Sequence, residues 1–196
     1  MSRTALLLSG GMDSAAIAFW KRPDVAITVD YGQKSARGEI RASSAICTAL
    51  NIRHEIVTVD CSSLGSGDLA GAKAHDLAPA SEWWPFRNQM LVTFGVMKGI
   101  DLGIDSLLVG SIRSDSFHAD GKREFYERMS ALVSNQEGSI RVEAPAIEME
   151  AGELILTSGI PNSLLGWTHS CHVADFACGL CRGCQKAFQL FKSMLL

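Results

Sequence analysis

The amino-acid sequence predicts an α/β protein with a doubly wound, mostly parallel sheet of five strands. Short apolar runs rich in Leu, Val and Ile alternate with longer segments in which apolar residues recur at helical spacing. Glycine-bearing turns follow the first strands. Strands that are apolar along their length and separated by helices are typical of a parallel sheet that is covered on both faces and binds ligands at the carboxyl ends of its strands.

The elements follow one another in this alternating order. We expect strands at residues 4–8, 24–30, 54–60, 106–110 and 140–145. We expect helices at 14–21, 35–50, 87–102, 124–134, 151–159 and 186–196. Residues 61–84 are rich in Gly, Ala and Ser without a clear period, which predicts a loop, and a loop of this length is often functional.

Length and composition are those of a globular protein. The chain has 196 residues, 47% of them hydrophobic and 20% charged, enough for one domain at 1–166 with a small C-terminal segment at 167–196. The net charge of −3 argues against a protein that mainly grips nucleic acid. The sequence shows neither a membrane span nor a secretory signal, so we expect a cytoplasmic protein.

The stretch SGGMDS, residues 9–14, joins the first strand to the first helix. Gly10 and Gly11 allow a sharp turn and a close approach of a ligand, and the free N–H groups of the turn and of the helix favour phosphate. Ser9 and Ser14 add hydroxyl donors. Asp13 would repel phosphate unless a cation such as Mg²⁺ lies between them. The alternative is a plain strand-to-helix turn in which Asp13 and Ser14 serve only as caps.

Four of the six cysteines, Cys171, Cys178, Cys181 and Cys184, crowd into the C-terminal segment. Four thiolates at this spacing favour a closed, tetrahedral zinc site that stabilises the fold. An iron–sulfur cluster is a second possibility and disulfides a third, which a reducing compartment disfavours. His169 and His172 flank Cys171 and are expected to be bystanders.

SGGMDS is similar to the S-G-G-x-D-S signature of the PP-loop ATP pyrophosphatases. Together with VDYGQ (29–33), FRN (86–88), VGSIRSD (109–115) and SC…CGLCRGC, it resembles the 7-cyano-7-deazaguanine synthase family over nearly the whole chain. The resemblance implies Zn²⁺ at the cysteines and ATP with Mg²⁺ as cofactors. It implies a ligase that adenylates 7-carboxy-7-deazaguanine with release of pyrophosphate, lets ammonia form the amide, and dehydrates that amide to the nitrile.

The resemblance also assigns residues. Asp13, Arg87 and Asp115 are expected in catalysis. The nucleotide is expected to be bound by Ser9, Gly10, Gly11, Met12, Asp13, Ser14, Asp30, Gln33, Arg87, Asn88 and Gly110. Without the family, Arg87 reads as an ordinary surface ion pair.

Three positions depart from the family pattern. Ser35 stands where the family has histidine, FHADGKR replaces S-G-Y-P-D-C-R and keeps only Arg123, and Ala151 stands where lysine is expected. These departures put the second step, or the acceptor, in doubt. They allow a divergent relative in antiphage defence that joins the activated acid to an amine of a partner protein.

Other functions fit the pattern less well. A PP-loop enzyme that modifies tRNA needs a basic surface, and the chain lacks a dense Lys/Arg stripe. A zinc-ribbon binding module without catalysis is the non-enzyme alternative. The apolar C-terminal helix either packs on its own chain or joins two copies in a homodimer.

Overall fold

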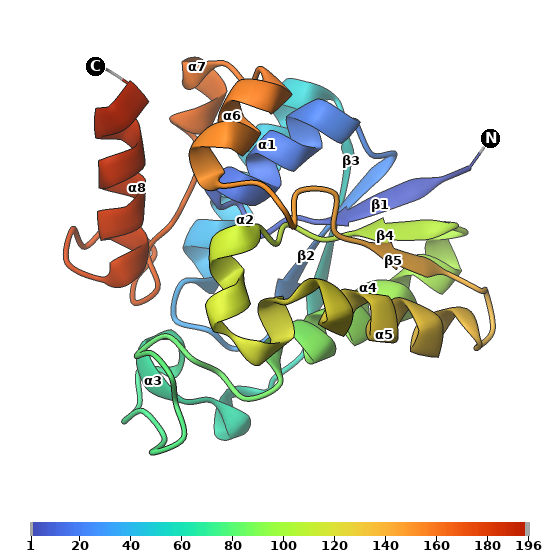
Figure 1. Ribbon diagram of the computed structural model, residues 1–196, viewed down its shortest axis with the longest axis horizontal. Helices are drawn as coiled ribbons and strands as arrows, with labels where there is room; N and C mark the ends of the chain where they lie inside the picture. Colours follow the sequence, from blue (N-terminus) through green and yellow to red (C-terminus); the bar gives the residue numbers. More distant parts are fainter. Residues whose placement is uncertain (1, 195–196) are drawn as a thin grey trace.

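The computed structural model describes residues 2–194, and its centre is a five-stranded sheet (Figure 1). The strands are β1 (Thr4–Leu7), β2 (Val25–Asp30), β3 (Arg53–Thr58), β4 (Ser106–Leu108) and β5 (Arg141–Glu143). They pair in the order β3-β2-β1-β4-β5, and every pairing is parallel. The sequence-based expectation of a five-stranded parallel sheet is confirmed.

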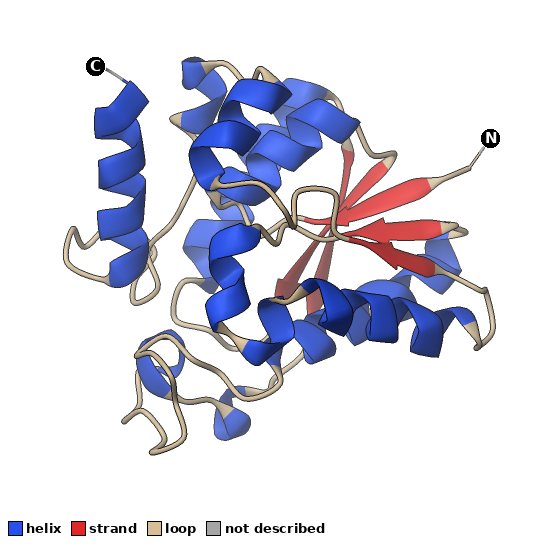
Figure 2. Ribbon diagram, viewed as in Figure 1, coloured by secondary structure: helices blue, strands red, loops and turns tan. Residues whose placement is uncertain are grey.

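Helices cover both faces of the sheet (Figure 2). The α-helices of the described residues are α1 (Met12–Lys21), α2 (Ala36–Leu50), α3 (Gly67–Ala70), α4 (Arg87–Leu102), α5 (Arg123–Ser134), α6 (Ala151–Ser158), α7 (Asn162–Leu165) and α8 (Arg182–Met194). One face packs against α4 and α5, and the other packs against α1, α2, α6 and α7. This is the doubly wound arrangement.

Alternation along the central strands divides the interior into two cores. In β1, Ala5 belongs to the core under α4 and α5, whereas Leu6 belongs to the core under α1 and α6. Leu107 and Leu108 of β4 divide in the same way. Successive side chains of a strand point to opposite faces, so a strand buried on both faces is apolar along most of its length, as β1 and β4 are after Thr4 and Ser106.

The structure differs from the sequence-based expectations mainly at element ends. The last helix begins at Arg182 and not at residue 186, so it includes Cys184. Residues 61–84 are irregular as expected, but contain a single 3-10 turn at Ser62–Leu64 and the short helix α3. Neither element has the length that would leave a periodic signal. Residues 195 and 196, in the expected last helix, lie outside the described residues.

The C-terminal helix packs partly on its own chain. Leu190 and Phe191 of α8 lie against the core under α1 and α6, while Phe188 remains 70% exposed. Packing against the core accounts for the apolar side chains of Leu190 and Phe191. The homodimer stays a prediction. The division of the chain into residues 1–166 and 167–196 also stays a prediction. Among the described residues, no helix combines the length and apolarity that a bilayer crossing requires.

Because Leu107 is fully buried in the central strand β4, we expect Leu107→Ala to lower the free energy of unfolding by about 2–5 kcal/mol. The matched control is Leu156→Ala, since Leu156 is 84% exposed on α6 and its truncation should cost less than about 0.5 kcal/mol. Urea unfolding followed by circular dichroism measures both variants. Equal effects of the two substitutions would contradict the assigned core.

Candidate active site

A glycine turn at the carboxyl end of β1 shapes the site. Gly10 has a φ of +75°, in the left-handed region that side chains disfavour. A Cβ at this position would lie 2.7 Å from the carbonyl oxygen of Glu39 and 2.8 Å from Cβ of Ala42. The turn therefore requires glycine both for its conformation and for the close approach of α2.

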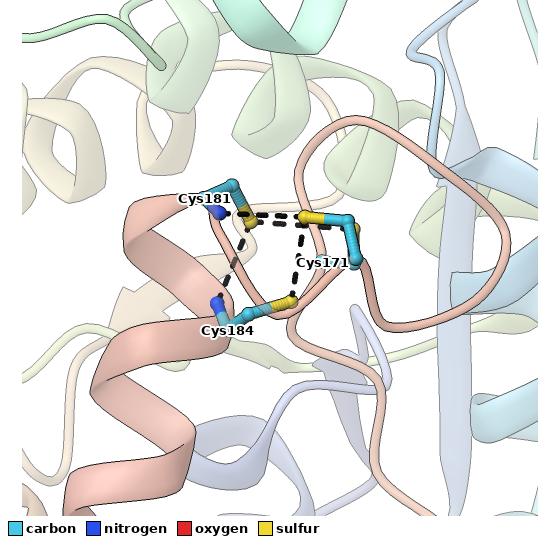
Figure 3. A group of neighbouring side chains, drawn as sticks. Cys171, Cys181 and Cys184 are labelled. Carbon is cyan, nitrogen blue, oxygen red and sulfur yellow. Dashed lines mark hydrogen bonds between the residues drawn. The ribbon is translucent and has the colours of Figure 1, made fainter.

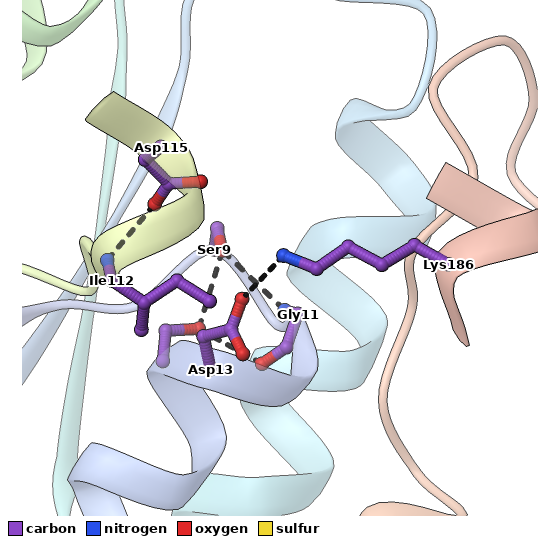
Figure 4. A network of polar contacts seen from close by, with 7 residues as sticks. Ser9, Gly11, Asp13, Ile112, Asp115 and Lys186 are labelled. Carbon is purple, nitrogen blue, oxygen red and sulfur yellow. Dashed lines mark hydrogen bonds and ion pairs between the residues drawn. The ribbon is translucent and has the colours of Figure 1, made fainter. Parts of the chain in front are cut away.

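The turn delivers the chain to the N-terminus of α1, where hydroxyl groups gather (Figure 4). The Ser9 and Ser14 hydroxyls lie 3.2 Å apart and share a hydrogen bond, and Ser14 Oγ also lies 3.0 Å from the carbonyl oxygen of Gly11. The N-cap residue of α1 is Gly11, which has no side chain that could accept a hydrogen bond from the first N–H groups of the helix. The first N–H groups of α1, together with these hydroxyls, form a group of donors suited to an anion.

Asp13, in the first turn of α1, has one engaged oxygen and one free oxygen. Its Oδ2 accepts a hydrogen bond from Lys186 Nζ at 3.3 Å, as Figure 4 shows. Its Oδ1 is buried and has no partner within the described residues. Burial raises the pKa of Asp13; Lys186 opposes this effect and the nearby Asp115 adds to it. Asp13 therefore does not act as a helix cap and keeps an oxygen for a ligand.

A cavity of about 650 Å³ lies at the carboxyl edge of the sheet, between the Gly10 turn and the C-terminal segment. Most of the residues expected from the sequence line it: Ser9, Gly11, Met12, Asp13, Ser14, Arg87, Asn88, Gly110 and Asp115. The Gly10 turn and Gly110 are close neighbours, because a Cβ on Gly110 would lie 3.2 Å from that of Ser14. The site therefore draws on β1, β4 and α4, segments far apart in the sequence.

Three expected residues, Gly10, Asp30 and Gln33, do not line this cavity. Asp30 Oδ1 accepts a hydrogen bond from the backbone N–H of Gly32 at 3.0 Å. Gln33 is buried, and its Nε2 donates to Glu39 Oε2 at 2.9 Å. Glu39 does line the cavity, so Gln33 reaches the site only by holding a neighbour.

Arg87 and Asn88 occupy the first turn of α4. Asn88 is held in place by Asp120, whose Oδ2 accepts from its backbone N–H at 3.1 Å and whose carbonyl oxygen accepts from its Nδ2 at 2.9 Å. Arg87 is half-buried beside it on the cavity wall. Asp115 Oδ2 accepts a hydrogen bond from the N–H of Ile112 at 3.0 Å. A cationic and an anionic side chain thus stand in fixed positions around the same cavity.

The C-terminal segment supplies residues that sequence reasoning missed. The backbone N–H of His169 donates to the carbonyl oxygen of Gly10 at 2.8 Å, which fastens the segment to the turn. His172, Arg182 and Lys186 also line the cavity. The only sequence signal was their position within and just after the cysteine cluster. Lys186 and Asp13 are 173 residues apart, and no local pattern predicts such a contact.

The four predicted cysteines lie together in this segment, and Figure 3 labels three of them, Cys171, Cys181 and Cys184. Their sulfurs are all within 4.8 Å of one another, with Cys178 Sγ 3.9 Å from Cys184 Sγ and Cys171 Sγ 4.0 Å from Cys181 Sγ. Zinc–sulfur bonds of about 2.3 Å in a tetrahedron require sulfurs about 3.8 Å apart. Hydrogen bonds from the N–H groups of Cys181 and Leu180 lower the pKa of the Cys178 thiol to about 6. The cluster therefore fits a zinc ion.

We expect about one zinc ion per chain in the wild-type protein and almost none in Cys181→Ser, because a closed site needs all four thiolates. Elemental analysis of the purified proteins measures the metal directly. Cys61→Ser is the matched control, since Cys61 is also buried but lies outside the cluster, and it should keep its zinc. Iron in place of zinc, or full zinc in Cys181→Ser, would contradict the assignment.

The raised pKa of Asp13 gives a pH dependence of stability. A carboxyl group whose pKa is raised by folding destabilises the fold when it is charged, so the cost is absent below its unfolded pKa and present above its folded pKa. Without nucleotide and metal, Asp13→Asn should therefore raise the melting temperature at pH 7, with no gain below about pH 3.9, the ordinary value for aspartate. Thermal unfolding across pH, with the exposed Asp101→Asn as control, measures this difference. A lower melting temperature at pH 7 would refute it.

The comparisons with known proteins agree with this geometry. A family model described as "Queuosine biosynthesis protein QueC" matches residues 3–195. "7-cyano-7-deazaguanine synthase" of Desulforudis audaxviator is 32% identical over 206 residues, which cover 92% of each chain. "7-cyano-7-deazaguanine synthase 1" of Desulfitobacterium hafniense is 29% identical over 205 residues, which cover 96% of this chain and 92% of the relative. The chain therefore belongs to the QueC family, whose relatives are named as synthases.

Proposed function

We propose that this protein uses ATP to activate 7-carboxy-7-deazaguanine and transfers the activated acid to an amine. A carboxylate oxygen of the substrate attacks the α-phosphorus of ATP, the bond to the bridging oxygen breaks, and pyrophosphate leaves. The amine nitrogen then attacks the acyl carbon, the anhydride C–O bond breaks, and AMP leaves while the nitrogen loses its proton to a base. The observation that carries this proposal is the Gly10 turn with the unpartnered Asp13 oxygen beside it.

The turn is suited to the diphosphate that departs. N–H groups at the start of α1 would donate to its oxygens and are held before the reaction begins. The Ser14 hydroxyl, which donates to the carbonyl oxygen of Gly11 in the structure, would turn to donate to a diphosphate oxygen. Asp13, with its free Oδ1, would hold Mg²⁺, which spreads the negative charge of the phosphates. Lys186 adds a positive charge at the same carboxylate.

The opposite wall is suited to the carboxylate. Arg87 lines the cavity at the start of α4 and offers the paired N–H donors that bind carboxylate or phosphate. The neighbouring Asn88 is fixed by its two hydrogen bonds to Asp120, which keeps this part of the wall in place. Asp115 stands on the same cavity and is the candidate acceptor for a proton of the incoming amine.

The departures from the family pattern lie partly outside the cavity. Ser35 is fully buried and donates to Glu39 Oε1 at 2.6 Å, and Ala151 begins α6. Neither of these two residues lines the cavity. The replaced segment FHADGKR does reach it, through His118, while its retained Arg123 pairs with Glu148 at 2.7 Å. The lysine that is missing at position 151 leaves Lys186 as the cation beside Asp13, which supports retention of the adenylation step.

Incubation with Mg²⁺, ATP and 7-carboxy-7-deazaguanine should yield AMP and pyrophosphate, and Asp13→Ala should lower the rate of pyrophosphate release by about 100-fold or more. The control is Asp101→Ala, an exposed aspartate on α4, which should retain the full rate. Mass spectrometry of the deazaguanine product with ammonium, or with a peptide amine, identifies the acceptor. Release of ADP and phosphate alone would overturn the proposal.

A further inference from the structure

The far wall of the cavity carries a second polar cluster, which the phosphate chemistry does not use. Glu82, at the end of the irregular segment 61–84, pairs with His118 and Arg182, and these three residues and His172 line the cavity. Glu82 is only 7% exposed. Its Oε1 accepts a hydrogen bond from Arg182 Nη1 at 2.8 Å and lies 3.8 Å from His118 Nε2. A carboxylate of this kind is taken out of water but not left unpaired.

Each of two residues in this cluster has a buried polar atom without a partner. Glu82 Oε2 and His172 Nδ1 make no hydrogen bond within the described residues. Buried polar atoms are normally satisfied, and leaving one unpaired costs about 1–3 kcal/mol. Both residues stand on the same cavity wall, so one ligand with two adjacent polar groups can satisfy both atoms.

The surroundings decide which ligand chemistry fits. Oε1 of the Glu82 carboxylate accepts from Arg182, so the free oxygen Oε2 is available to accept a hydrogen bond from a ligand. The Arg182 guanidinium already pairs with Glu82, which reduces the attraction of this carboxylate for a cationic amine. Ammonia also offers a single nitrogen, which is too small to meet two side chains. A neutral heterocycle whose edge carries an amino group beside a ring nitrogen meets both requirements.

We propose that Glu82 and His172 form a subsite for the amino-bearing edge of the deazapurine, with Glu82 Oε2 accepting from the exocyclic 2-amino group and His172 Nδ1 bonding the adjacent ring nitrogen. A turn about the terminal torsion of Glu82, which is soft, presents Oε2 to the cavity. The His172 ring packs closely against Gly183, so it has less freedom to turn than the Glu82 carboxylate. A Cβ at position 183 would lie only 2.6 Å from His172 Nε2.

This inference rests on the proposed function and adds a determinant of substrate choice to it. The Gly10 turn holds the triphosphate at one end of the cavity, and the Glu82 subsite holds the heterocycle at the other. The carboxylate of the substrate then lies between them, near Arg87. Segment 61–84 acquires a role as the carrier of a specificity residue.

Calorimetric binding of 7-carboxy-7-deazaguanine, without ATP, tests the subsite apart from catalysis. The wild-type protein should bind this compound about 10-fold or more tightly than the analogue that lacks the 2-amino group, because a hydrogen bond to a charged acceptor is lost. Glu82→Gln should bind the full compound about 10-fold more weakly and should lose the preference. The matched control is Glu137→Gln, an exposed glutamate that should keep it.

The outcomes separate the subsite from the function. A wild-type protein that binds the acid with less than a twofold preference for the 2-amino compound overturns the subsite alone, and this measurement needs no variant. An equal preference in Glu82→Gln overturns it too, as does a variant whose only defect is a raised KM for the amine. A wild-type protein that does not bind the acid, yet binds ATP, overturns both proposals.

Discussion

The backbone turn at Gly10 is the constraint on which the rest of the site depends. Three separate parts of the chain meet at this residue: the turn itself between β1 and α1, the carbonyl oxygen of Glu39 on α2, and the backbone N–H of His169. A side chain here would collide with α2 and would also strain a φ of +75°. One glycine thus sets the direction of α1, the distance of α2 and the place where the C-terminal segment attaches.

The parallel sheet explains why these parts meet where they do. All five strands run in one direction, so the loops that follow β1, β2 and β4 leave from the same edge. The order β3-β2-β1-β4-β5 places β1 between β2 and β4: the chain runs from β1 through β2 to β3 on one side of β1 and then crosses to β4 and β5 on the other side. Such a reversal opens a crevice at the carboxyl ends of the strands. The cavity beside Ser9, Gly110 and Arg87 lies at this position.

The sequence was informative wherever the physical cause is local. Strands that are apolar on both faces, such as those that contain Leu6 and Leu107, can be predicted because both faces are buried. The turn at Gly10 can be predicted because glycine adopts backbone conformations that other residues disfavour. The four cysteines have a spacing that by itself predicts a metal cluster. Lys186 and Glu82 could not be predicted in this way, because their contacts with Asp13 and Arg182 join residues 173 and 100 positions apart. Their roles depend on how the C-terminal segment folds over the sheet edge.

The same argument links the metal cluster to the chemistry without placing a metal in the reaction. The four cysteines are spread over residues 171–184, and the segment that they close carries Arg182 to Glu82 and positions α8, from which Lys186 reaches Asp13. A short segment with few apolar contacts would not hold such side chains in register by packing alone, since Phe176 and Leu180 are 73% and 82% exposed. A metal bound by the cysteines would supply the rigidity that the small hydrophobic contact area lacks. Such a metal would have a structural role, and through Arg182 and Lys186 it would also influence the geometry of the cavity.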